Sequence, residues 1–597
     1  MASIMPPISR RGMHRTLPPW SSVLLAALSL LALCEARSAT ATDNLRIEAP
    51  EALQQLLTKH IDAYRDASGA LDAAEIARMQ QRARQQATEL LATQGYFSPT
   101  IDFDIGLPPG VETHLMRVDP GPRTTVGGVR IDFTGAVAEA RPEYEQRRQA
   151  LRDAWPLHPG DSFVDAQWRS GKTALLRLLT ERDFAAARIA QSQATVDPDA
   201  ASASLSVLYD SGPAYTLGDI EVTGLSRYGP ELVKRYARFD SGAPYSPDVL
   251  LDFQRRLQNS PYFSTVLVDV APEATTGDQL PVRVSVTEEK SRHVTLSAGY
   301  STNTGARTEI AYQQADFLGR PWNLVTGLRI EQLRQAAYAD MFLPPDRDDW
   351  VWSFGTLAEA TDIRGLRTRR AAAGVVRSRT TEKIDQRVSL TLQEERTAVQ
   401  DGPVTLRTAL FPGWSWTRRE VDNVLDPRRG NVLNLQAHAG TKLLLSDQNF
   451  FRAYAQAHLY YPVGEWDVAS VRVEAGQVFA PSSDGVPQQL LFRAGGTRSV
   501  RGYAYQSLGP RVGSAVVGGR SLLTMSAEYT HWFVHDWGAA VFVDAGNAAD
   551  TWSNLDLRVG YGAGPRWRSP AGPVAVDLAY APRERRVRLH FSLQVAF

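Results

Sequence analysis

The pattern of hydrophobic and polar positions changes its period at about Ser291. Before that point, segments of helical period are interspersed with short segments in which every second residue is apolar. The clearest unit predicts a helix that begins at Pro247, with Ser246 as its N-cap, followed by strands at 266–270 and 280–286. A strand precedes this unit, so the pattern is typical of a small α+β module.

A short string recurs in the N-terminal part and indicates repeated modules. Residues 121–131 (GPRTTVGGVRI) return 91 residues later at 212–222 (GPAYTLGDIEV), and both copies lead into a Thr-Gly pair. An aromatic junction between helix and strand occurs three times, at 95–97, 183–184 and 262–263. We therefore expect three modules, at 42–120, 121–211 and 212–289. A single larger α/β domain is the alternative.

After Ser291 the alternating period continues to the end of the chain. The last segment places Val587, Leu589, Phe591, Leu593, Val595 and Phe597 on one face, and Arg588, His590, Ser592 and Gln594 on the other. Many strands of this kind predict a membrane barrel with lipid outside and a wet lumen inside. At roughly 19 residues for each strand with its connection, residues 290–597 predict about 16 antiparallel strands. A soluble β-sandwich is the alternative.

The N-terminus predicts export from the cytoplasm. An apolar run of 13 residues, 22–34, follows three arginines and precedes Ala39-Thr40-Ala41, which is the order of a cleavable signal peptide at 1–41. The run is too short to span a bilayer as a helix. Its removal would take away Cys34, the one cysteine, and would leave neither thiol chemistry nor disulfides.

Composition and motifs favour neither an enzyme nor a nucleic-acid binder. Lys plus Arg and Asp plus Glu both total 65 in 597 residues, so the basic surplus of a nucleic-acid binder is missing. Gly171-Lys172-Thr173 lacks the first glycine of a phosphate loop, and Gly560, Gly562 and Gly564 alternate within a predicted strand, as small inward residues of a barrel would. The acidic residues at 346–349 are expected to form a solvated loop. We expect no cofactor and no metal site.

One string between two predicted strands carries more information. Residues 495–505 read GGTRSVRGYAY, and 541–547 (VFVDAGN) follow one hairpin later. Here the chain resembles the outer-membrane assembly and translocation superfamily that includes BamA, TamA and the two-partner secretion transporters. The resemblance implies that the modules are POTRA (polypeptide-transport-associated) domains. It also implies that a loop with Val500, Arg501, Gly502 and Tyr503 folds into the barrel, where Arg501 meets Asp544.

The alternation supports this pair independently. Asp544 lies on the face opposite Val541 and Val543, so it points into the lumen if the valines face lipid. A partly desolvated carboxylate favours a planar, bidentate cation, and an arginine on an incoming loop provides one. The alternative is that Arg501 is a solvated loop charge.

Within the superfamily the chain resembles the TamA branch. Three modules fit it, and residues 294–305 (VTLSAGYSTNTG) are similar to its first barrel strand, although Asn303 replaces an acidic residue. The resemblance implies a protein of the bacterial outer membrane with periplasmic modules, in contact with outer-membrane lipid. It implies a TamB-like inner-membrane-anchored partner and clients such as autotransporters. A two-partner secretion transporter and a passive channel remain alternatives.

Closure of such a barrel predicts a seam between its first and last strands. Unpaired backbone groups in hydrocarbon each cost several kcal/mol, so we expect the segments near 294–301 and 587–597 to pair. We expect this seam to be short or strained, so that a client strand can add to it without ATP. A fully paired, inert seam is the alternative. The predicted seam residues are Val294, Thr295, Ser297, Gly299, Ser592, Gln594 and Phe597.

Overall fold

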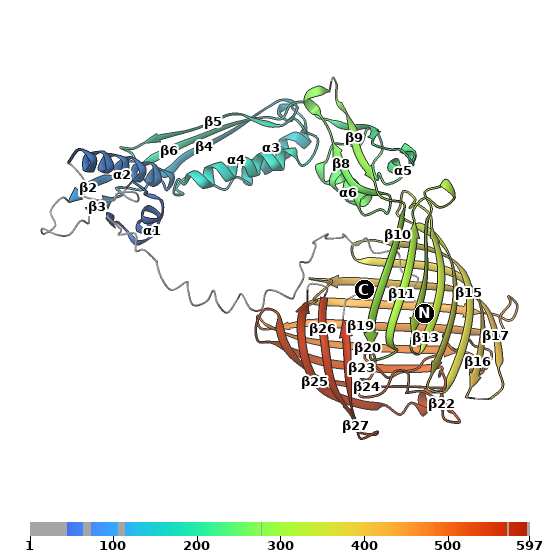
Figure 1. Cartoon of the computed structure of the whole chain (residues 1–597). Coiled ribbons are helices and arrows are strands. Elements are labelled where there is room, and N and C mark those ends of the chain that lie inside the picture. The colour runs from blue at the N-terminus through green and yellow to red at the C-terminus, as the bar shows by residue number, and fades with distance from the viewer. Residues whose placement is uncertain are drawn as a thin grey trace.

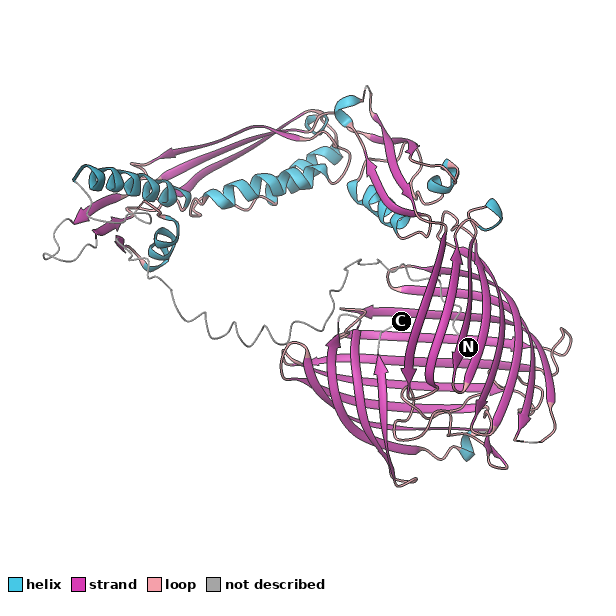
Figure 2. Ribbon diagram, viewed as in Figure 1, coloured by secondary structure: helices cyan, strands magenta, loops and turns pink. Residues whose placement is uncertain are grey.

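The computed structural model describes residues 45–63, 73–104, 114–275, 277–400, 402–569 and 572–593. The predicted signal peptide with Cys34, and the seam residues Gln594 and Phe597, lie outside these ranges. An arm of three small α+β modules leads into a large barrel (Figure 1). Figure 2 shows that helices gather in the arm and that the barrel is built almost wholly of strands. No helix in the described ranges is long and apolar enough to cross a membrane.

Each module folds in the order strand, helix, helix, strand, strand. Its first strand pairs in parallel with its third, which pairs antiparallel with its second, and each module has its own apolar core. The elements are β1 (Leu45–Glu48), α1 (Glu51–His60), α2 (Ala73–Thr93), β2 (Thr100–Asp104) and β3 (His114–Asp119); β4 (Thr125–Thr134), α3 (Pro142–Asp153), α4 (Asp165–Thr180), β5 (Arg188–Asp197) and β6 (Ser202–Asp210); β7 (Thr216–Thr223), α5 (Pro230–Lys234), α6 (Pro247–Gln258), β8 (Phe263–Asp269) and β9 (Gln279–Glu288).

The repeated string owes its glycines to backbone conformation. Gly121 and Gly212, which open the two copies, both have positive φ, at 69° and 63°. Gly135 and Gly224, which close the strands β4 and β7, do as well, at 78° and 88°. A Cβ at Gly224 would collide with the carbonyl oxygen of Val286 on β9. The glycines therefore recur because the turns at both ends of the first strand of a module require positive φ.

The barrel is one antiparallel sheet of 16 strands that runs from β10 to β27, which confirms the predicted fold class. Two short strands, β21 (Arg511–Val512) and β22 (Ala515–Val516), pair with each other within the connection between β20 and β23. The barrel strands are β10 (Arg292–Ser301), β11 (Gly305–Gln314), β12 (Asn323–Glu331), β13 (Arg334–Phe342), β14 (Val351–Ile363), β15 (Leu366–Thr380), β16 (Ile384–Val399), β17 (Thr405–Val421), β18 (Gly430–Gly440), β19 (Phe450–Val463), β20 (Asp467–Phe479), β23 (Ser521–Trp532), β24 (Trp537–Ala549), β25 (Arg558–Ser569), β26 (Gly572–Ala581) and β27 (Arg586–Leu593).

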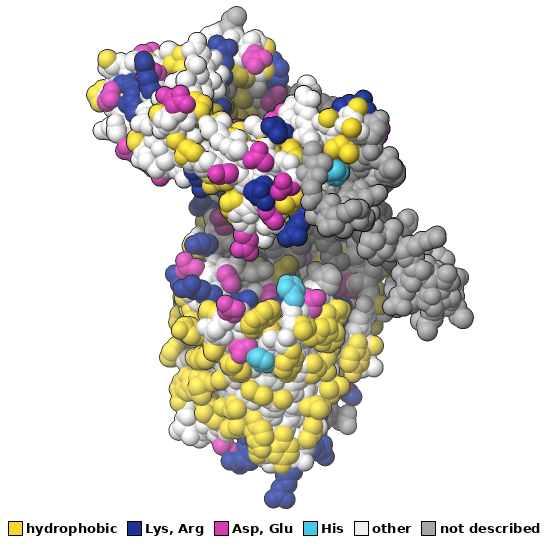
Figure 3. All heavy atoms as spheres, turned by 90° about the vertical axis from the view of Figure 1, so that its left-hand side faces the viewer, with side chains coloured by type: hydrophobic (Ala, Val, Ile, Leu, Met, Phe, Trp, Pro, Cys, Tyr) yellow, Lys and Arg dark blue, Asp and Glu magenta, His cyan; other side chains and the backbone are white. Residues whose placement is uncertain are grey.

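The outer wall of the barrel is apolar. On β24, Val541 and Val543 are exposed on the outside, whereas Phe542 and Asp544 between and beside them are buried inside. Figure 3 shows hydrophobic side chains covering the barrel wall in a band, with charged side chains above and below it. This distribution fits a wall that lies in hydrocarbon and ends in water.

The sequence predicts a wet lumen, but part of the lumen is apolar. A cluster of buried apolar residues fills part of it, because the connection between β20 and β23, residues 480–520, folds inward against the wall. Leu490, Phe492, Val500 and Tyr503 of this lumenal loop pack in the cluster with wall residues such as Phe411. A wet lumen, which the alternation of the strands predicts, is therefore not found in this region, because the loop fills it.

The two end strands of the sheet do not pair within the described residues 292–301 and 586–593. The side chains of β10 are exposed along nearly its whole length, on both faces. One hydrogen bond crosses the gap, from the backbone N–H of Phe591 to Oγ1 of Thr302 at 3.4 Å. The expectation that these segments form a ladder is thus not met in the described part of β27.

Candidate functional site: the lumenal loop and the barrel seam

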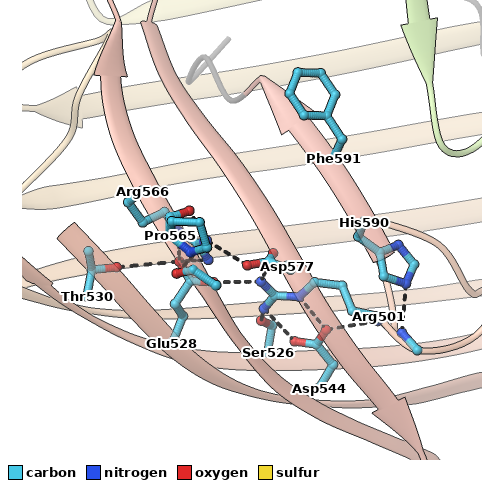
Figure 4. A network of polar contacts seen from close by, with 12 residues as sticks. Arg501, Ser526, Glu528, Thr530, Asp544, Pro565, Arg566, Asp577, His590 and Phe591 are labelled. Carbon is cyan, nitrogen blue, oxygen red and sulfur yellow. Dashed lines mark hydrogen bonds and ion pairs between the residues drawn. The ribbon is translucent and has the colours of Figure 1, made fainter. Parts of the chain in front are cut away.

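Arg501 lies at the inner end of the lumenal loop and binds Asp544 on β24. Its backbone N–H and its Nε both donate to Oδ2 of Asp544, at 2.9 Å and 2.8 Å, and its Nη2 donates to Oδ1 at 2.9 Å (Figure 4). Arg501 is 6% exposed and Asp544 is 0% exposed. The structure therefore brings these two residues together in bidentate geometry inside the barrel.

Two further carboxylates and a second arginine complete the network around Arg501. Its Nη1 donates to Glu528 on β23 at 2.7 Å and to Asp577 on β26 at 3.0 Å. Arg566 on β25 binds the same two carboxylates, with N–O distances of 2.9 Å and 2.6 Å. Three carboxylates and one arginine on four neighbouring strands thus surround the guanidinium of Arg501, and these contacts between opposite charges offset the cost of burying them.

Sequence reasoning missed Glu528, Asp577 and Arg566 as partners of Arg501. In the sequence, each of these residues shows only that a charged side chain lies on the inward face of a predicted strand. Which inward charges meet depends on how neighbouring strands are staggered, and no local pattern reports that stagger.

Close backbone approach explains the glycines around Arg501. Gly502 has a φ of 92°, and a Cβ there would lie 3.1 Å from backbone atoms of Tyr580 on β26. A Cβ at Gly560 on β25 would collide with the carbonyl oxygen of Arg501. The guanidinium carbon of Arg501 lies 3.3 Å from the ring centroid of Phe542. The loop is therefore pressed against the inner wall, with Val500 and Tyr503 fully buried beside it.

The loop also crosses the lumen to the opposite wall. Glu395 on β16 is fully buried and accepts the backbone N–H of Gln488 at 2.7 Å. The side chain of Gln489 donates to Gln393 on the same strand. The loop is thus held at β16 near its start and at β23–β26 near Arg501.

Both edges of the seam touch the lumenal loop. On the β27 side, the backbone N–H of Gly502 donates to Nε2 of His590 at 2.9 Å. On the β10 side, Asn303 in the turn after β10 donates from Nδ2 to Oγ1 of Thr497 at 2.9 Å and accepts the backbone N–H of Thr497 at 3.4 Å. Asn303 therefore acts through its amide, where the resemblance implies an acidic side chain.

The predicted seam residues lie on the two end strands where the structure describes them. Val294, Thr295, Ser297 and Gly299 lie on β10 and are exposed. Ser592 lies on β27. Four of the predicted positions therefore lie on an exposed edge that pairs with no other strand in the described part of the chain.

The acidic loop between β13 and β14 is not simply solvated, so that expectation is wrong. Asp349 is mostly buried and binds Arg238 and Arg256 of the third module. Asp346 accepts the backbone N–H of Asp348 at 3.0 Å and of Trp350 at 2.9 Å. Partial burial raises the pKa of Asp346, but these hydrogen bonds and Arg377 outweigh it and hold that pKa below its ordinary range. The loop is a joint between barrel and arm.

A second carboxylate, Glu288, ties the end of β9 to the turn after β7. It accepts the backbone N–H groups of Ser226, Arg227 and Tyr228 at 2.9, 2.9 and 3.1 Å. The Ser226 hydroxyl and Arg227 Nε also donate to it, at 2.8 Å and 3.0 Å. Burial raises the pKa of Glu288, but the backbone and side-chain donors of Ser226 and Arg227 outweigh burial and lower the pKa to about 2.

Among the described residues, no group of three or more His, Cys, Asp or Glu side chains is placed to hold a metal ion. Each of the three carboxylates around Arg501 is bonded to at least one arginine of the same network. Its geometry is suited to holding a loop in place.

Comparison with known proteins places these features in context. A model of the Omp85 superfamily domain matches residues 276–597, and a POTRA model, described as surface antigen variable number repeat, matches residues 215–289. The chain is 24% identical over 595 residues to the outer membrane protein assembly factor BamA of Neisseria meningitidis serogroup B, covering 86% of this chain and 72% of that protein. It is 22% identical to the BamA of Neorickettsia risticii, covering 76% of this chain and 64% of that protein.

A solved structure has a similar fold. The crystal structure of BamA from Haemophilus ducreyi lacking POTRA domains 1–3 aligns with a TM-score of 0.65 at 16% identity. The alignment covers 79% of this chain and 98% of that one. At this identity the likeness concerns the fold of arm and barrel.

Proposed function

The chain belongs to the Omp85 superfamily, and on that premise we propose that it assembles other proteins into the bacterial outer membrane. We assign it a role like that of TamA, with autotransporters and other β-barrel proteins as clients. The modules then lie in the periplasm, where a TamB-like inner-membrane-anchored protein is the partner. The protein is not an enzyme in this proposal.

The observation that carries the proposal is the edge of β10, which pairs with no strand among the described residues. A strand edge without a partner offers a row of N–H and C=O groups to which another strand can add. In hydrocarbon, an unpaired edge costs several kcal/mol for each backbone group, so a client strand that pairs there is strongly favoured. The energy for insertion then comes from the client, and no nucleotide is needed.

The loop in the lumen supports this role over that of a passive channel. A solute channel requires an open path through the barrel, whereas residues 480–520 fill part of this lumen with buried apolar side chains. A large and constantly open conductance in single-channel recordings would contradict this interpretation. Transport of one dedicated secreted protein, without insertion of barrels, would favour a two-partner secretion transporter.

The test uses a disulfide across the seam. Thr302 and Phe591 already approach each other there, so we place Thr302→Cys and Phe591→Cys in a Cys34→Ala background. Reconstituted in phospholipid vesicles, the reduced protein should speed the insertion of an unfolded barrel client without ATP, measured by protease protection. The oxidised protein, verified by mass, should lose this acceleration and regain it on reduction. An oxidised seam that assembles clients at the reduced rate would overturn the proposal.

A further inference from the structure

The segment 497–502 of the lumenal loop makes contacts at both sides of the open seam. Thr497 binds Asn303 in the turn after the first strand, and five residues later Gly502 binds His590 on the last strand. The intervening Arg501 is fixed to Asp544 on β24 by three hydrogen bonds. A short and firmly anchored piece of chain thus contacts both end strands where their described residues, 292–301 and 586–593, do not pair.

Little else in the described part of the chain holds the two edges together there. A cavity of about 620 Å³ lies between them, lined by residues of both edges and of the loop, among them Tyr300, Asn303, Tyr505, Arg588 and His590. Apart from the Phe591–Thr302 hydrogen bond, the described backbones of β10 and β27 remain apart. The position of each edge therefore depends on what it touches inside the barrel.

We propose that residues 497–502 form a clasp that sets the width of the seam, with Asn303 and His590 as its positioning residues. The biological purpose of the clasp rests on the proposed function. The clasp itself does not, because the width of the seam is a property of the protein without any client. Neither residue would contact the client in this scheme. Each acts by holding one edge against the same piece of loop.

The two sides of the clasp differ in their surroundings. His590 is 5% exposed and accepts from a backbone N–H that is buried against β26, so its Nε2 is unprotonated. The Asn303–Thr497 pair is only partly buried, and one of its two hydrogen bonds is long, at 3.4 Å. We infer that the first strand is released more easily than the last, which is the order needed for β10 to receive a client strand.

The test measures the seam directly with spin labels on its outer side. Leu296 on β10 and Val587 on β27 are exposed on the outer wall and do not line this cavity, so Leu296→Cys and Val587→Cys in the Cys34→Ala background leave it intact. Double electron–electron resonance on the full chain in nanodiscs gives the distance distribution across the seam. Asn303→Ala should at least double the width of this distribution, and His590→Phe should do the same.

Conservative and distant variants separate a clasp from a general loss of structure. His590→Gln keeps a side-chain acceptor for the N–H of Gly502 and should restore a narrow distribution. Gln489→Ala loosens the same loop at β16, away from the seam, and should leave the distribution unchanged. If Gln489→Ala widens the seam as much as Asn303→Ala does, the clasp is not the cause.

The double variant gives the sharpest outcome. The two contacts act in series through one piece of loop, so breaking either one already disconnects the edges. Asn303→Ala combined with His590→Phe should therefore widen the distribution no further than the wider single variant. Additive widening, or no widening by Asn303→Ala in protein that still runs as a compact unboiled band, would overturn the clasp. Because no client is present, this outcome is independent of the assembly test.

Discussion

At the scale of single residues, the lumenal network depends on the shape of arginine as much as on its charge. Arg501 reaches three carboxylates and stacks on Phe542 at the same time. A guanidinium has five donors in a plane and can do this, whereas the ammonium of lysine is a compact charge that cannot bind Asp544 in a bidentate way. The position therefore selects arginine specifically.

We predict that Arg501→Ala and Arg501→Lys both destabilise the barrel. Removing the guanidinium leaves buried carboxylates without their partner, which typically costs on the order of 2 to 5 kcal/mol. The compact unboiled band should convert to the unfolded form at a lower temperature, and the loop should become sensitive to protease. Arg498→Ala, an exposed position of the same loop, is the matched control. An Arg501→Lys protein as heat-resistant as the wild type would contradict this account.

The sequence predicts one pair of this network and no more. Alternation places Asp544 in the lumen, and the family resemblance names Arg501 as its partner. Glu528, Asp577 and His590 are equally inward, but their meeting with the loop depends on strand stagger and on the path of residues 480–520. Both are set by packing between segments far apart in the chain.

At the scale of elements, local patterns predict strands and helices well and their edges less well. Helix α6 begins at Pro247 as expected, with Leu250, Phe253 and Leu257 buried, although the side chain of Ser246 makes no capping hydrogen bond. Of the outward residues predicted for the last strand, Val587, Leu589 and Phe591 are exposed as expected. The expected pairing across the seam is not found between the described residues 292–301 and 586–593, because the argument from hydrocarbon considers the sheet alone and omits the loop that contacts both edges.

In the third module we predict that stability depends on pH through Glu288, which joins the end of β9 to the turn after β7. Its pKa is lowered from an ordinary 4.5 to about 2, so its hydrogen bonds stabilise the fold fully above about pH 4.5. This stability is lost as the pH falls from there through about 2, and it amounts to roughly 3 kcal/mol before screening by solvent reduces it. Amide exchange of Ser226, Arg227 and Tyr228, corrected for intrinsic rates, should speed up over that window.

The variant Glu288→Gln provides the control for this pH dependence. An amide keeps most of the shape but does not titrate, so protection at 226–228 should already be low at neutral pH and should not change between pH 4.5 and 2. Exchange that responds to pH equally in both proteins would show that another group is responsible.

At the scale of the whole molecule, the arm is joined to the barrel by ion pairs as well as by the chain itself. Asp349, in the turn between β13 and β14, accepts Arg238 and Arg256 of the third module, and Tyr262 donates to the carbonyl oxygen of Pro321 at 2.7 Å. Figure 1 shows this module seated at the end of the barrel where β10 begins. Because β9 leads into β10 within four residues, a tilt of the module acts directly on the seam edge.

We therefore predict that Asp349→Asn loosens the arm on the barrel. The change removes the negative partner of two arginines, and because the Arg238 side chain is 41% exposed the loss is about 1 kcal/mol. That corresponds to roughly a fivefold shift toward undocked arms. Labels at Thr265→Cys and Glu382→Cys in the Cys34→Ala background should report a broader distance distribution. Raising the salt concentration should broaden the wild-type distribution in the same direction, since screening weakens exposed pairs most. Asp348→Asn, an exposed neighbour in the same turn, should have no effect, and equal broadening in both variants would show that the turn itself, rather than the charge of Asp349, holds the arm.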